Sequence, residues 1–218
     1  SATPMAAMKR AAVDPDNLVN RPRDISFVID MLEKLNQAED DWRGWFQLDR
    51  IGVGGHSFGA YTAMAVAGMN FILPDGRKLN FADKRIKAAL VLSPTAGRLQ
   101  MRNGAKICED MTIPCFFMTG TQDNSPINDT QAADRRRVFD HARNVRFLLT
   151  FIGGDHMVFS GRRRSPLLDG TSSGNDAVFQ QLTAAMSLAF FNGDVGRDEA
   201  AQAEFRRLGE KAAADKLA

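Results

Sequence analysis

Cysteine and histidine are scarce in this sequence, and their scarcity limits the chemistry that the chain can support. The 218 residues include two cysteines and three histidines. Two cysteines are too few for a disulfide framework, and no group of cysteines and histidines has the spacing of metal ligands. We therefore expect no metal and no cofactor, and we expect Cys115 to be a packing residue in a strand. The sequence leaves open whether Cys108 and Cys115 are bridged.

Strong net charge and long apolar runs are also missing. The formal net charge is +2, which gives no reason to expect a nucleic-acid partner. No apolar run approaches the ~20 residues that a helix needs to span a bilayer, so we expect a soluble protein. Because the chain begins with Ser1 rather than methionine, we expect a processed, tagged or fragmentary polypeptide. A signal peptide would lie upstream, so the compartment, cytoplasmic or exported, stays open.

What the sequence does contain is a Gly-x-Ser-x-Gly pentapeptide at residues 55–59. The apolar, glycine-rich run 51–54 precedes it and the small-residue stretch 60–69 follows it, which predicts a strand, a sharp turn and a helix. Such a turn lifts one serine hydroxyl above the sheet, at the N-terminus of the helix. We interpret Ser57 as a nucleophile. The alternative is a glycine-rich turn with an exposed serine.

A serine nucleophile needs a general base, and the three histidines are the candidates. His56 lies inside the pentapeptide, where the turn is expected to direct its side chain away from the Ser57 hydroxyl. His141 lies in a charged helical pattern and is expected to be a surface or packing residue. His156 follows the apolar run 145–152, at the end of a predicted strand. We predict His156 as the base.

The base needs an orienting carboxylate, which we expect in a loop between the serine and the histidine. The run 113–118 predicts a buried strand that leads into Asp123, so we predict Asp123 as the acid. Asp129 is the reserve candidate, although it is farther from the strand and resembles a helix cap. Asp155 is expected to be a loop carboxylate, because adjacent side chains such as Asp155 and His156 rarely face each other.

The hydrophobic pattern predicts an α/β fold in a single domain. Continuous apolar runs separated by helical patterns favour a mostly parallel sheet with helices on both faces. The predicted strands are 50–54, 87–92, 113–118 and 146–152, and the predicted helices are 22–37, 58–69, 130–142, 176–191 and 197–215.

Outside these elements the pattern is weaker. We divide the chain into an N-terminal loop segment (1–20), for which a frayed helix is the alternative, the main domain (21–193) and a C-terminal helix (194–218). Residues 71–84 look irregular. Trp42 and Trp45 are expected to pack beneath the sheet, with a role facing the substrate as the alternative. The arginine run 162–164 is interpreted as a solvated loop, with attraction or clamping of an acidic substrate as the alternative.

Four segments resemble one known family. They are Arg21-Pro22-Arg23-Asp24-Ile25-Ser26-Phe27-Val28-Ile29-Asp30, Gly55-His56-Ser57-Phe58-Gly59-Ala60-Tyr61-Thr62-Ala63, Gly120-Thr121-Gln122-Asp123 and Gly153-Gly154-Asp155-His156-Met157. Over roughly residues 20–192 the chain resembles the predicted dienelactone hydrolases of the α/β-hydrolase superfamily. These are serine-dependent relatives of platelet-activating-factor acetylhydrolases and bacterial polyester-cleaving esterases.

The resemblance implies the α/β-hydrolase fold and hydrolysis of a carboxylic ester or lactone. It also implies Ser57 as nucleophile, Asp123 as acid and His156 as base, in the chain order that α/β-hydrolases use. The dienelactone hydrolases proper have a cysteine nucleophile, so their substrate is not carried over to this chain.

The chain departs from the family in front of the pentapeptide. In this superfamily several strands, and a loop with an oxyanion donor, precede the nucleophile. The residues before Ser57 contain no convincing strand. We therefore expect this chain to hold only the C-terminal part of the sheet, which a companion N-terminal segment would complete. The Phe58 backbone N–H would supply one oxyanion donor, and the second donor is not in this chain.

The expected activity is hydrolysis of a small-molecule ester through an acyl-enzyme. Two alternatives stay open. Acyl transfer or peptide hydrolysis could use the same three side chains, because the shape of the pocket selects the acceptor. A catalytically inactive binding or assembly fragment is the other alternative, which the missing front half of the sheet favours.

Overall fold

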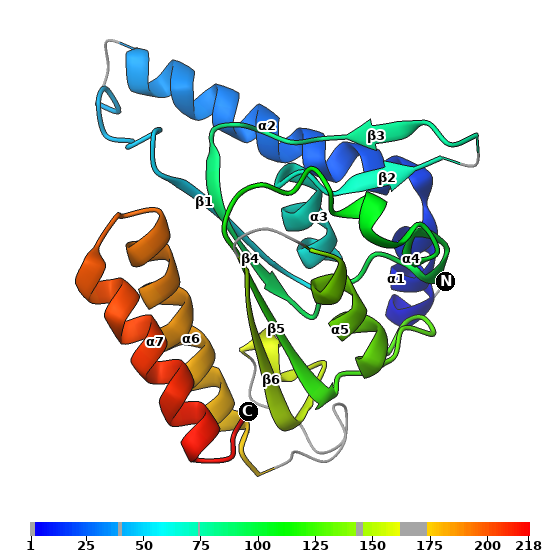
Figure 1. Cartoon of the computed structure of the whole chain (residues 1–218). Helices are drawn as coiled ribbons and strands as arrows, with labels where there is room; N and C mark the ends of the chain where they lie inside the picture. Colours follow the sequence, from blue (N-terminus) through cyan, green and yellow to red (C-terminus); the bar gives the residue numbers. More distant parts are fainter. Residues whose placement is uncertain (1–2, 39–40, 74, 143–145, 162–173) are drawn as a thin grey trace.

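The centre of the protein is a four-stranded parallel sheet (Figure 1). The computed structural model describes residues 3–38, 41–73, 75–142, 146–161 and 174–218. The strands lie in the order β1-β4-β5-β6, and all three neighbouring pairs are parallel. This arrangement confirms the predicted α/β fold with a parallel sheet. The strand bounds are Ile51–His56, Ile86–Leu92, Cys115–Gln122 and Arg146–Asp155.

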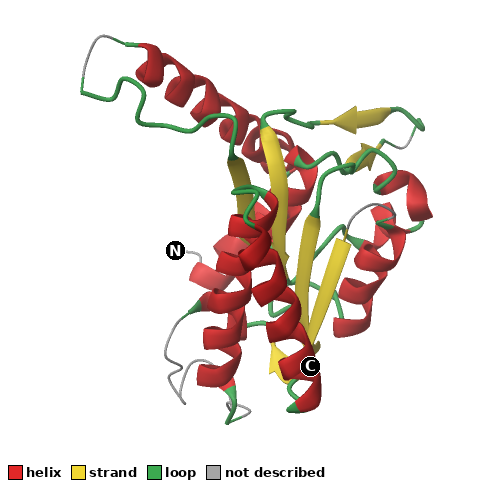
Figure 2. Ribbon diagram, turned by 60° about the vertical axis from the view of Figure 1, so that its left-hand side comes forward, coloured by secondary structure: helices red, strands yellow, loops and turns green. Residues whose placement is uncertain are grey.

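Helices cover both faces of the sheet (Figure 2). On one face lie α3 (Phe58–Val66) and α5 (Ala132–His141), with α2 (Pro15–Gln37) packed on α3. On the other face lie α6 (Asp176–Asp194) and α7 (Glu199–Ala214). All five were predicted as helices, although α2 begins before the predicted residue 22.

Successive residues of the central strands pack on opposite faces, as the pleat of a strand requires. Val91 and Phe117 belong to the buried cluster beneath α3. Their neighbours Leu90 and Phe116 belong to the cluster beneath α6 and α7. Both faces of the sheet are therefore apolar, which explains the continuous apolar runs in the sequence.

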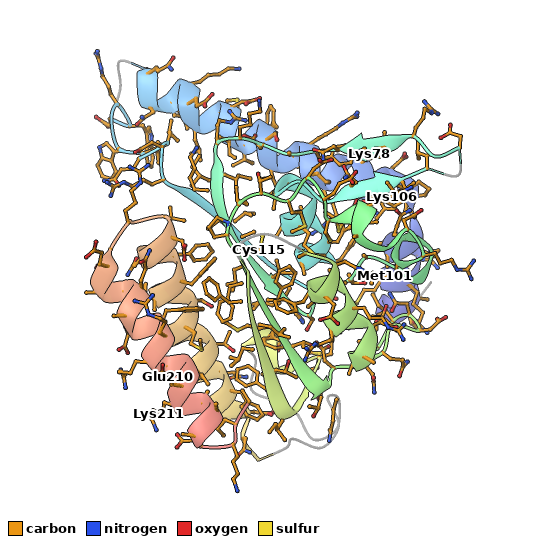
Figure 3. The ribbon with its side chains drawn as sticks, in the orientation of Figure 1. Lys78, Met101, Lys106, Cys115, Glu210 and Lys211 are labelled. Atoms are coloured by element: carbon orange, nitrogen blue, oxygen red, sulfur yellow. The ribbon has the colours of Figure 1, made fainter. Side chains whose placement is uncertain are left out.

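A short antiparallel hairpin lies outside the sheet, where irregular chain was predicted over 71–84. In it, β2 (Asn70–Ile72) pairs with β3 (Lys78–Asn80). Lys78, labelled in Figure 3, ties the hairpin to a neighbouring loop through a 2.6 Å ion pair with Glu109. Strands this short show too little alternation to be recognised in a sequence. The remaining short helices are α4 (Arg98–Met101) and the 3-10 turns η1 (Gly104–Ile107) and η2 (Val158–Ser160).

Between residues 4 and 20 the chain is mostly helical, so of the two alternatives for 1–20, a loop or a frayed helix, the loop is wrong. Both α1 (Pro4–Val13) and α2 begin at a proline, each preceded by a capping side chain, Thr3 and Asp14 respectively. A proline at the first helical position loses no hydrogen bond, because that N–H has no partner within a helix. Pro22, which was expected in a first turn, lies inside α2. The boundary predicted after residue 20 also falls inside this helix.

The two tryptophans do not pack beneath the sheet, and that prediction is wrong. Trp42 is 48% exposed and Trp45 is 72% exposed. Instead they form a small surface cluster, in which the ring centroid of Trp42 lies 5.8 Å from that of Trp45 and 5.8 Å from that of Phe46. The arginine run 162–164 lies outside the described residues.

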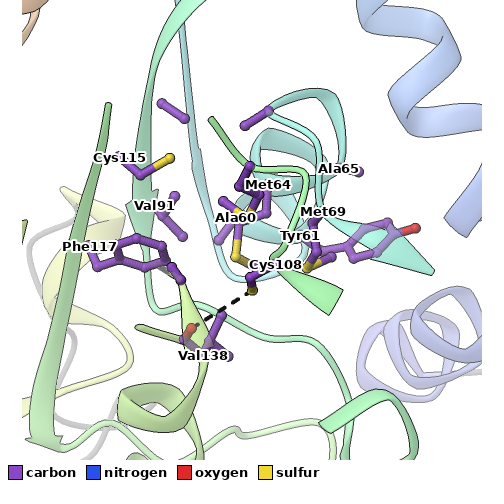
Figure 4. Close-up of a cluster of buried hydrophobic side chains, with 14 of the residues drawn as sticks. Ala60, Tyr61, Met64, Ala65, Met69, Val91, Cys108, Cys115, Phe117 and Val138 are labelled. Carbon is purple, nitrogen blue, oxygen red and sulfur yellow. Dashed lines mark hydrogen bonds between the residues drawn. The ribbon is translucent and has the colours of Figure 1, made fainter. Parts of the chain in front are cut away.

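Both cysteines are buried free thiols. Cys115 packs in the cluster beneath α3, which confirms its predicted role. The Sγ atom of Cys108 lies 4.0 Å from the Val138 carbonyl oxygen (Figure 4). Burial raises the pKa of each thiol to about 12. Both are therefore neutral packing groups at neutral pH.

Candidate active site

Ser57 occupies a sharp turn between β1 and α3. Its backbone has φ 58° and ψ −115°, a strained conformation for a residue with a side chain. The turn is fixed to the end of β4, because the Ser57 N–H donates to the Leu92 carbonyl at 3.0 Å. A Cβ atom at Gly55 would collide with the carbonyl oxygen of Gly59. The glycines of the pentapeptide therefore let the strand and helix backbones approach closely.

His156 and Asp123 reach Ser57 from the loops that follow β6 and β5. The Nε2 atom of His156 lies 3.0 Å from Ser57 Oγ, and its Nδ1 atom lies 2.8 Å from Asp123 Oδ1. The Thr119 hydroxyl donates to the other carboxylate oxygen of Asp123 at 2.8 Å. Asp123 is 0% exposed and His156 is 6% exposed. The structure thus joins the three residues selected from the sequence in one chain of contacts.

A close approach of β5 and β6 brings the loops of Asp123 and His156 together. A Cβ atom at Gly120, near the end of β5, would collide with the backbone of Gly154, near the end of β6. The register of the two strands also shifts between Gly120 and Gln122. The absence of a side chain at Gly120 therefore allows the contact between the two loops.

The other candidates from the sequence lie outside this chain of contacts. Asp155 accepts a hydrogen bond from the Met157 N–H at 2.9 Å, in the turn after β6. The carbonyl of Asp129 accepts from the Gln131 side chain at 3.1 Å, just before α5. His141 is the last residue of α5.

Arg135 is a site residue that sequence reasoning missed. Its side chain, on α5, is 1% exposed. Its Nε atom lies 2.8 Å from Asp123 Oδ1 and donates to the Asp123 carbonyl at 2.7 Å. Its Nη1 atom donates to the carbonyls of Ser93 at 3.0 Å and Pro94 at 3.2 Å. One guanidinium therefore holds the loops after β4 and β5 and pairs the buried charge of Asp123.

The sequence offers little signal for this role. Arg135 belongs to a run of three arginines in a charged helical pattern, and the side chains of Arg136 and Arg137 are 61% and 65% exposed. The one available sign is helical spacing, since Arg135 and the buried Val138 are three residues apart and share a face of α5.

His56 packs against the ring of His156. The two ring centroids are 4.6 Å apart, and the ring of Phe159 lies 6.0 Å from His56. Burial, followed by the nearby charge of a protonated His156, lowers the pKa of His56 from 6.5 to about 4. His56 is therefore neutral at neutral pH. Its Nε2 atom is buried and has no hydrogen-bond partner among the described residues.

A cavity of about 180 Å³ lies beside Ser57. Its walls come from α1, α2, the start of α3, β2 and the loops that follow β4 and β5. Apolar side chains dominate these walls, and Arg135 reaches the cavity from α5. The apolar lining includes Leu18, Phe58, Tyr61, Phe71, Ala96 and Ile127.

In the described part of the chain, no group of three or more histidine, cysteine, aspartate and glutamate side chains is arranged to hold a metal ion. No described helix combines the length and the hydropathy that a membrane crossing demands.

Comparison with protein-family models and with curated proteins finds no match to this chain. Among solved structures, a crystal structure of puromycin hydrolase matches with a TM-score of 0.48 at 14% identity, over 76% of this chain and 24% of that chain. A truncated form of a carbohydrate esterase from gut microbiota matches with a TM-score of 0.46 at 14% identity, over 84% of this chain and 69% of that one. This chain thus spans about a quarter of the puromycin hydrolase. These likenesses are distant and carry no argument about activity.

Proposed function

We propose that the protein is a serine hydrolase that cleaves carboxylic esters or lactones. One observation carries this proposal: the 3.0 Å contact between Ser57 Oγ and His156 Nε2 continues through the 2.8 Å contact between His156 Nδ1 and Asp123. A serine hydroxyl that can pass its proton to an oriented imidazole is an activated nucleophile. The strained turn that presents Ser57 supports the same role.

In the proposed mechanism, Ser57 Oγ attacks the ester carbonyl while His156 Nε2 takes its proton. Asp123 accepts the hydrogen bond from His156 Nδ1–H, which leaves Nε2 free to accept from Ser57. Collapse of the tetrahedral intermediate expels the alcohol, which receives the proton from His156. Water then repeats the sequence on the acyl-enzyme and releases the acid.

Arg135 strengthens this arrangement in the proposed mechanism. Its Nη2 atom lies 3.0 Å from His156 Nδ1. A guanidinium can only donate hydrogen bonds. Because His156 Nδ1 carries a proton in the proposed mechanism, it is also a donor, and the two nitrogen atoms do not hydrogen-bond to each other. In the proposed tautomer the His156 Nδ1–H donates to Asp123 Oδ1 at 2.8 Å. The Arg135 Nε–H donates to the Asp123 carbonyl at 2.7 Å, and the guanidinium forms an ion pair with the same Oδ1, which lies 2.8 Å from Nε. We assign Arg135 as a positioning residue, which fixes the carboxylate that in turn orients the base.

The developing oxyanion would be stabilised by the backbone N–H of Phe58. As the first residue of α3, Phe58 has no acceptor for its N–H within the helix. The N-terminus of a helix also favours negative charge. The second donor, which we expect from outside this chain, would belong to a companion segment.

We further propose that the companion segment pairs with β1. In the described chain β1 is an edge strand that pairs with β4. An unpaired edge leaves backbone donors and acceptors open for a further strand. The inner face of α2 packs beside Ile51 of β1, whereas Phe27 and Val28 on the same helix are 60% and 52% exposed. Native mass spectrometry tests this proposal: an active, folded 24.0 kDa species with no companion would contradict it.

The finer assignment is to the predicted dienelactone hydrolases. All four segments that carry this resemblance contribute to one region, because Arg21 contacts α3 through a 3.1 Å hydrogen bond to Thr62, and the other three segments hold Ser57, Asp123 and His156. Acyl transfer or peptide hydrolysis is the second candidate, since the same three side chains would serve it. Adding an alcohol or amine acceptor to the assay, and measuring acyl transfer against hydrolysis, distinguishes these activities.

Hydrolysis of p-nitrophenyl esters by Ser57→Ala tests the proposal. We expect the substitution to lower kcat/KM by about 10⁴-fold or more while the protein stays folded. Ser187→Ala on α6 is the matched control, because this serine lies away from Ser57 in the sequence and donates within its own helix, to the Thr183 carbonyl at 2.6 Å. Equal activity of Ser57→Ala and the wild type would reject the assignment. A wild type without ester turnover would favour the inactive binding or assembly fragment.

A further inference from the structure

Two cavities lie side by side near Ser57, and three side chains line both of them. The first is the cavity of about 180 Å³ at Ser57, and the second has a volume of about 510 Å³ and extends under the hairpin of β2 and β3. The second cavity is also lined by Leu73, Leu79 and Phe81. The side chains common to both are Leu18, Tyr61 and Phe71. We call these three the dividing wall.

The dividing wall is fixed by a hydrogen bond that depends on Pro22. The Tyr61 hydroxyl donates to the Leu18 carbonyl at 2.8 Å. In an ordinary helix this carbonyl would accept from the N–H four residues later, but that residue is Pro22, which has no N–H. The proline therefore frees the Leu18 carbonyl for Tyr61. Burial raises the pKa of Tyr61 to about 12, so the hydroxyl keeps its proton at neutral pH.

Arg21, next to this proline, holds α2 on the helix that follows the nucleophile. Its Nε atom donates to the Thr62 hydroxyl at 3.1 Å, and its guanidinium lies 4.7 Å from the ring centroid of Phe58. The ring of Phe58 in turn lies 5.8 Å from that of Tyr61. The Arg21-Pro22 pair, which carried part of the family resemblance, therefore positions the dividing wall relative to Ser57.

We propose that the cavity beside Ser57 receives the acyl group of the substrate, and that the dividing wall restricts this group to a short apolar chain. The inference rests on the proposed function, because only an acyl group remains attached to Ser57 and must occupy space that begins at its Oγ. A cavity of about 180 Å³ has room for roughly four to six carbon atoms. A longer chain meets the dividing wall before it can enter the second cavity.

A chain-length series of p-nitrophenyl esters tests the wild type. We expect kcat/KM to rise about fourfold for each methylene group that enters the cavity. We then expect it to fall once the acyl chain reaches the wall, between roughly four and six carbons. A value that rises steadily to twelve carbons, or that does not depend on length, would overturn the proposal. A kcat/KM that depends on the alcohol group of the ester and not on its acyl group would also overturn the proposal.

Leu18→Ala should open the wall while it keeps the backbone carbonyl that Tyr61 needs. We expect the preferred acyl length to increase by several carbons, because the two cavities then join. The matched control is Leu79→Ala, which enlarges only the second cavity and should leave the wild-type preference unchanged. An equal shift in both variants, or in neither, would contradict the role of the wall. If Leu18→Ala does not fold, inhibition of the wild type by n-alkylboronic acids of increasing length measures the longest chain that the cavity beside Ser57 accepts.

Pro22→Ala and Tyr61→Phe test the hydrogen bond itself. Pro22→Ala supplies an N–H that competes for the Leu18 carbonyl, and Tyr61→Phe removes the donor. Each should broaden the length preference, and the double variant should broaden it no further than either single one. Additive effects would show that the two residues act independently. Fluorophosphonate labelling of Ser57 distinguishes failure of the proposed function from failure of this inference. A wild type that is not labelled contradicts the serine hydrolase activity. A wild type that is labelled but accepts acyl chains of any length contradicts only the role of the dividing wall.

Discussion

Two buried regions of this protein are stabilised by different interactions. At the carboxyl ends of the strands, Asp123 and Arg135 are 0% and 1% exposed and form an ion pair, which is tied to neighbouring loops by hydrogen bonds. On the face covered by α6 and α7, aromatic rings pack together. The ring centroid of Phe116 lies 5.6 Å from that of Phe190 and 4.8 Å from that of Phe205.

Because the two regions are held by different interactions, we expect substitutions in them to affect stability and activity differently. An apolar cluster loses stability when a side chain is shortened, in proportion to the cavity that remains. A buried ion pair loses more than a contact when one partner is removed, because the other charge stays buried without compensation. Substitutions in the aromatic cluster should therefore affect folding alone, whereas substitutions in the polar region should affect both folding and catalysis.

Arg135→Met should have the largest effect, because it disturbs both properties. It leaves the Asp123 charge buried and unpaired, so we expect the free energy of unfolding to fall by about 3–5 kcal/mol. The activity per folded molecule should also fall, since the acid is no longer fixed. Urea denaturation and ester hydrolysis measure the two effects. Arg136→Met is the matched control, because Arg136 is exposed and its ion pair with Asp140 contributes at most about 1 kcal/mol.

Phe116→Ala should destabilise only the aromatic cluster beneath α6 and α7. Phe116 is 1% exposed and contacts two other rings of the cluster. We expect a loss of about 3–5 kcal/mol in the free energy of unfolding, measured by denaturation. The kcat/KM of the molecules that remain folded should not change. A large loss of activity in fully folded Phe116→Ala would show that the two regions are coupled.

Gly55→Ala should disturb the nucleophile specifically. The new Cβ collides with the Gly59 carbonyl, so the turn must shift and carry Ser57 with it. A displacement of about 1 Å costs on the order of 10²-fold in rate. Gly54→Ala provides the comparison, since its Cβ would lie 3.5 Å from Leu90 Cβ, an ordinary contact. Similar esterase activities of the two variants would argue against a fixed turn.

His56 should produce the smallest effect, and only in acid. Its pKa is lowered to about 4 in the folded protein, against 6.5 when unfolded. The unfolded state therefore binds the proton more readily, and stability falls as the pH decreases from 6.5 toward 4. Between pH 7 and pH 5 this group should cost about 2 kcal/mol of stability. His56→Gln should reduce that pH dependence; an unchanged dependence would mean that other groups cause it.

Much of the architecture could be predicted from the sequence, because its signals are local. The apolar runs located the four strands of the sheet, and the pentapeptide located the turn at Ser57. The strand ends then selected Asp123 and His156, since loops at the carboxyl ends of parallel strands share one edge. The roles of these residues stay predictions until activity is measured.

The features that were missed depend on contacts between distant segments. Burial distinguishes Arg135 from Arg136, and the local sign of it, the helical spacing between Arg135 and Val138, is weak. The prolines at residues 4 and 15 start helices in the segment that was expected to be a loop or a frayed helix. The pairing of Tyr61 with Leu18 joins residues 43 positions apart. Trp42 and Trp45 were expected to pack beneath the sheet, although the structure exposes both.

The most direct test of the account is labelling of the folded protein with a fluorophosphonate, followed by peptide mass spectrometry. The account predicts a single adduct, on Ser57, that forms in the wild type and is strongly reduced in His156→Ala, because the imidazole must take the serine proton. Wild-type protein that is folded but unlabelled at Ser57, or an adduct that forms equally fast without His156, would contradict it.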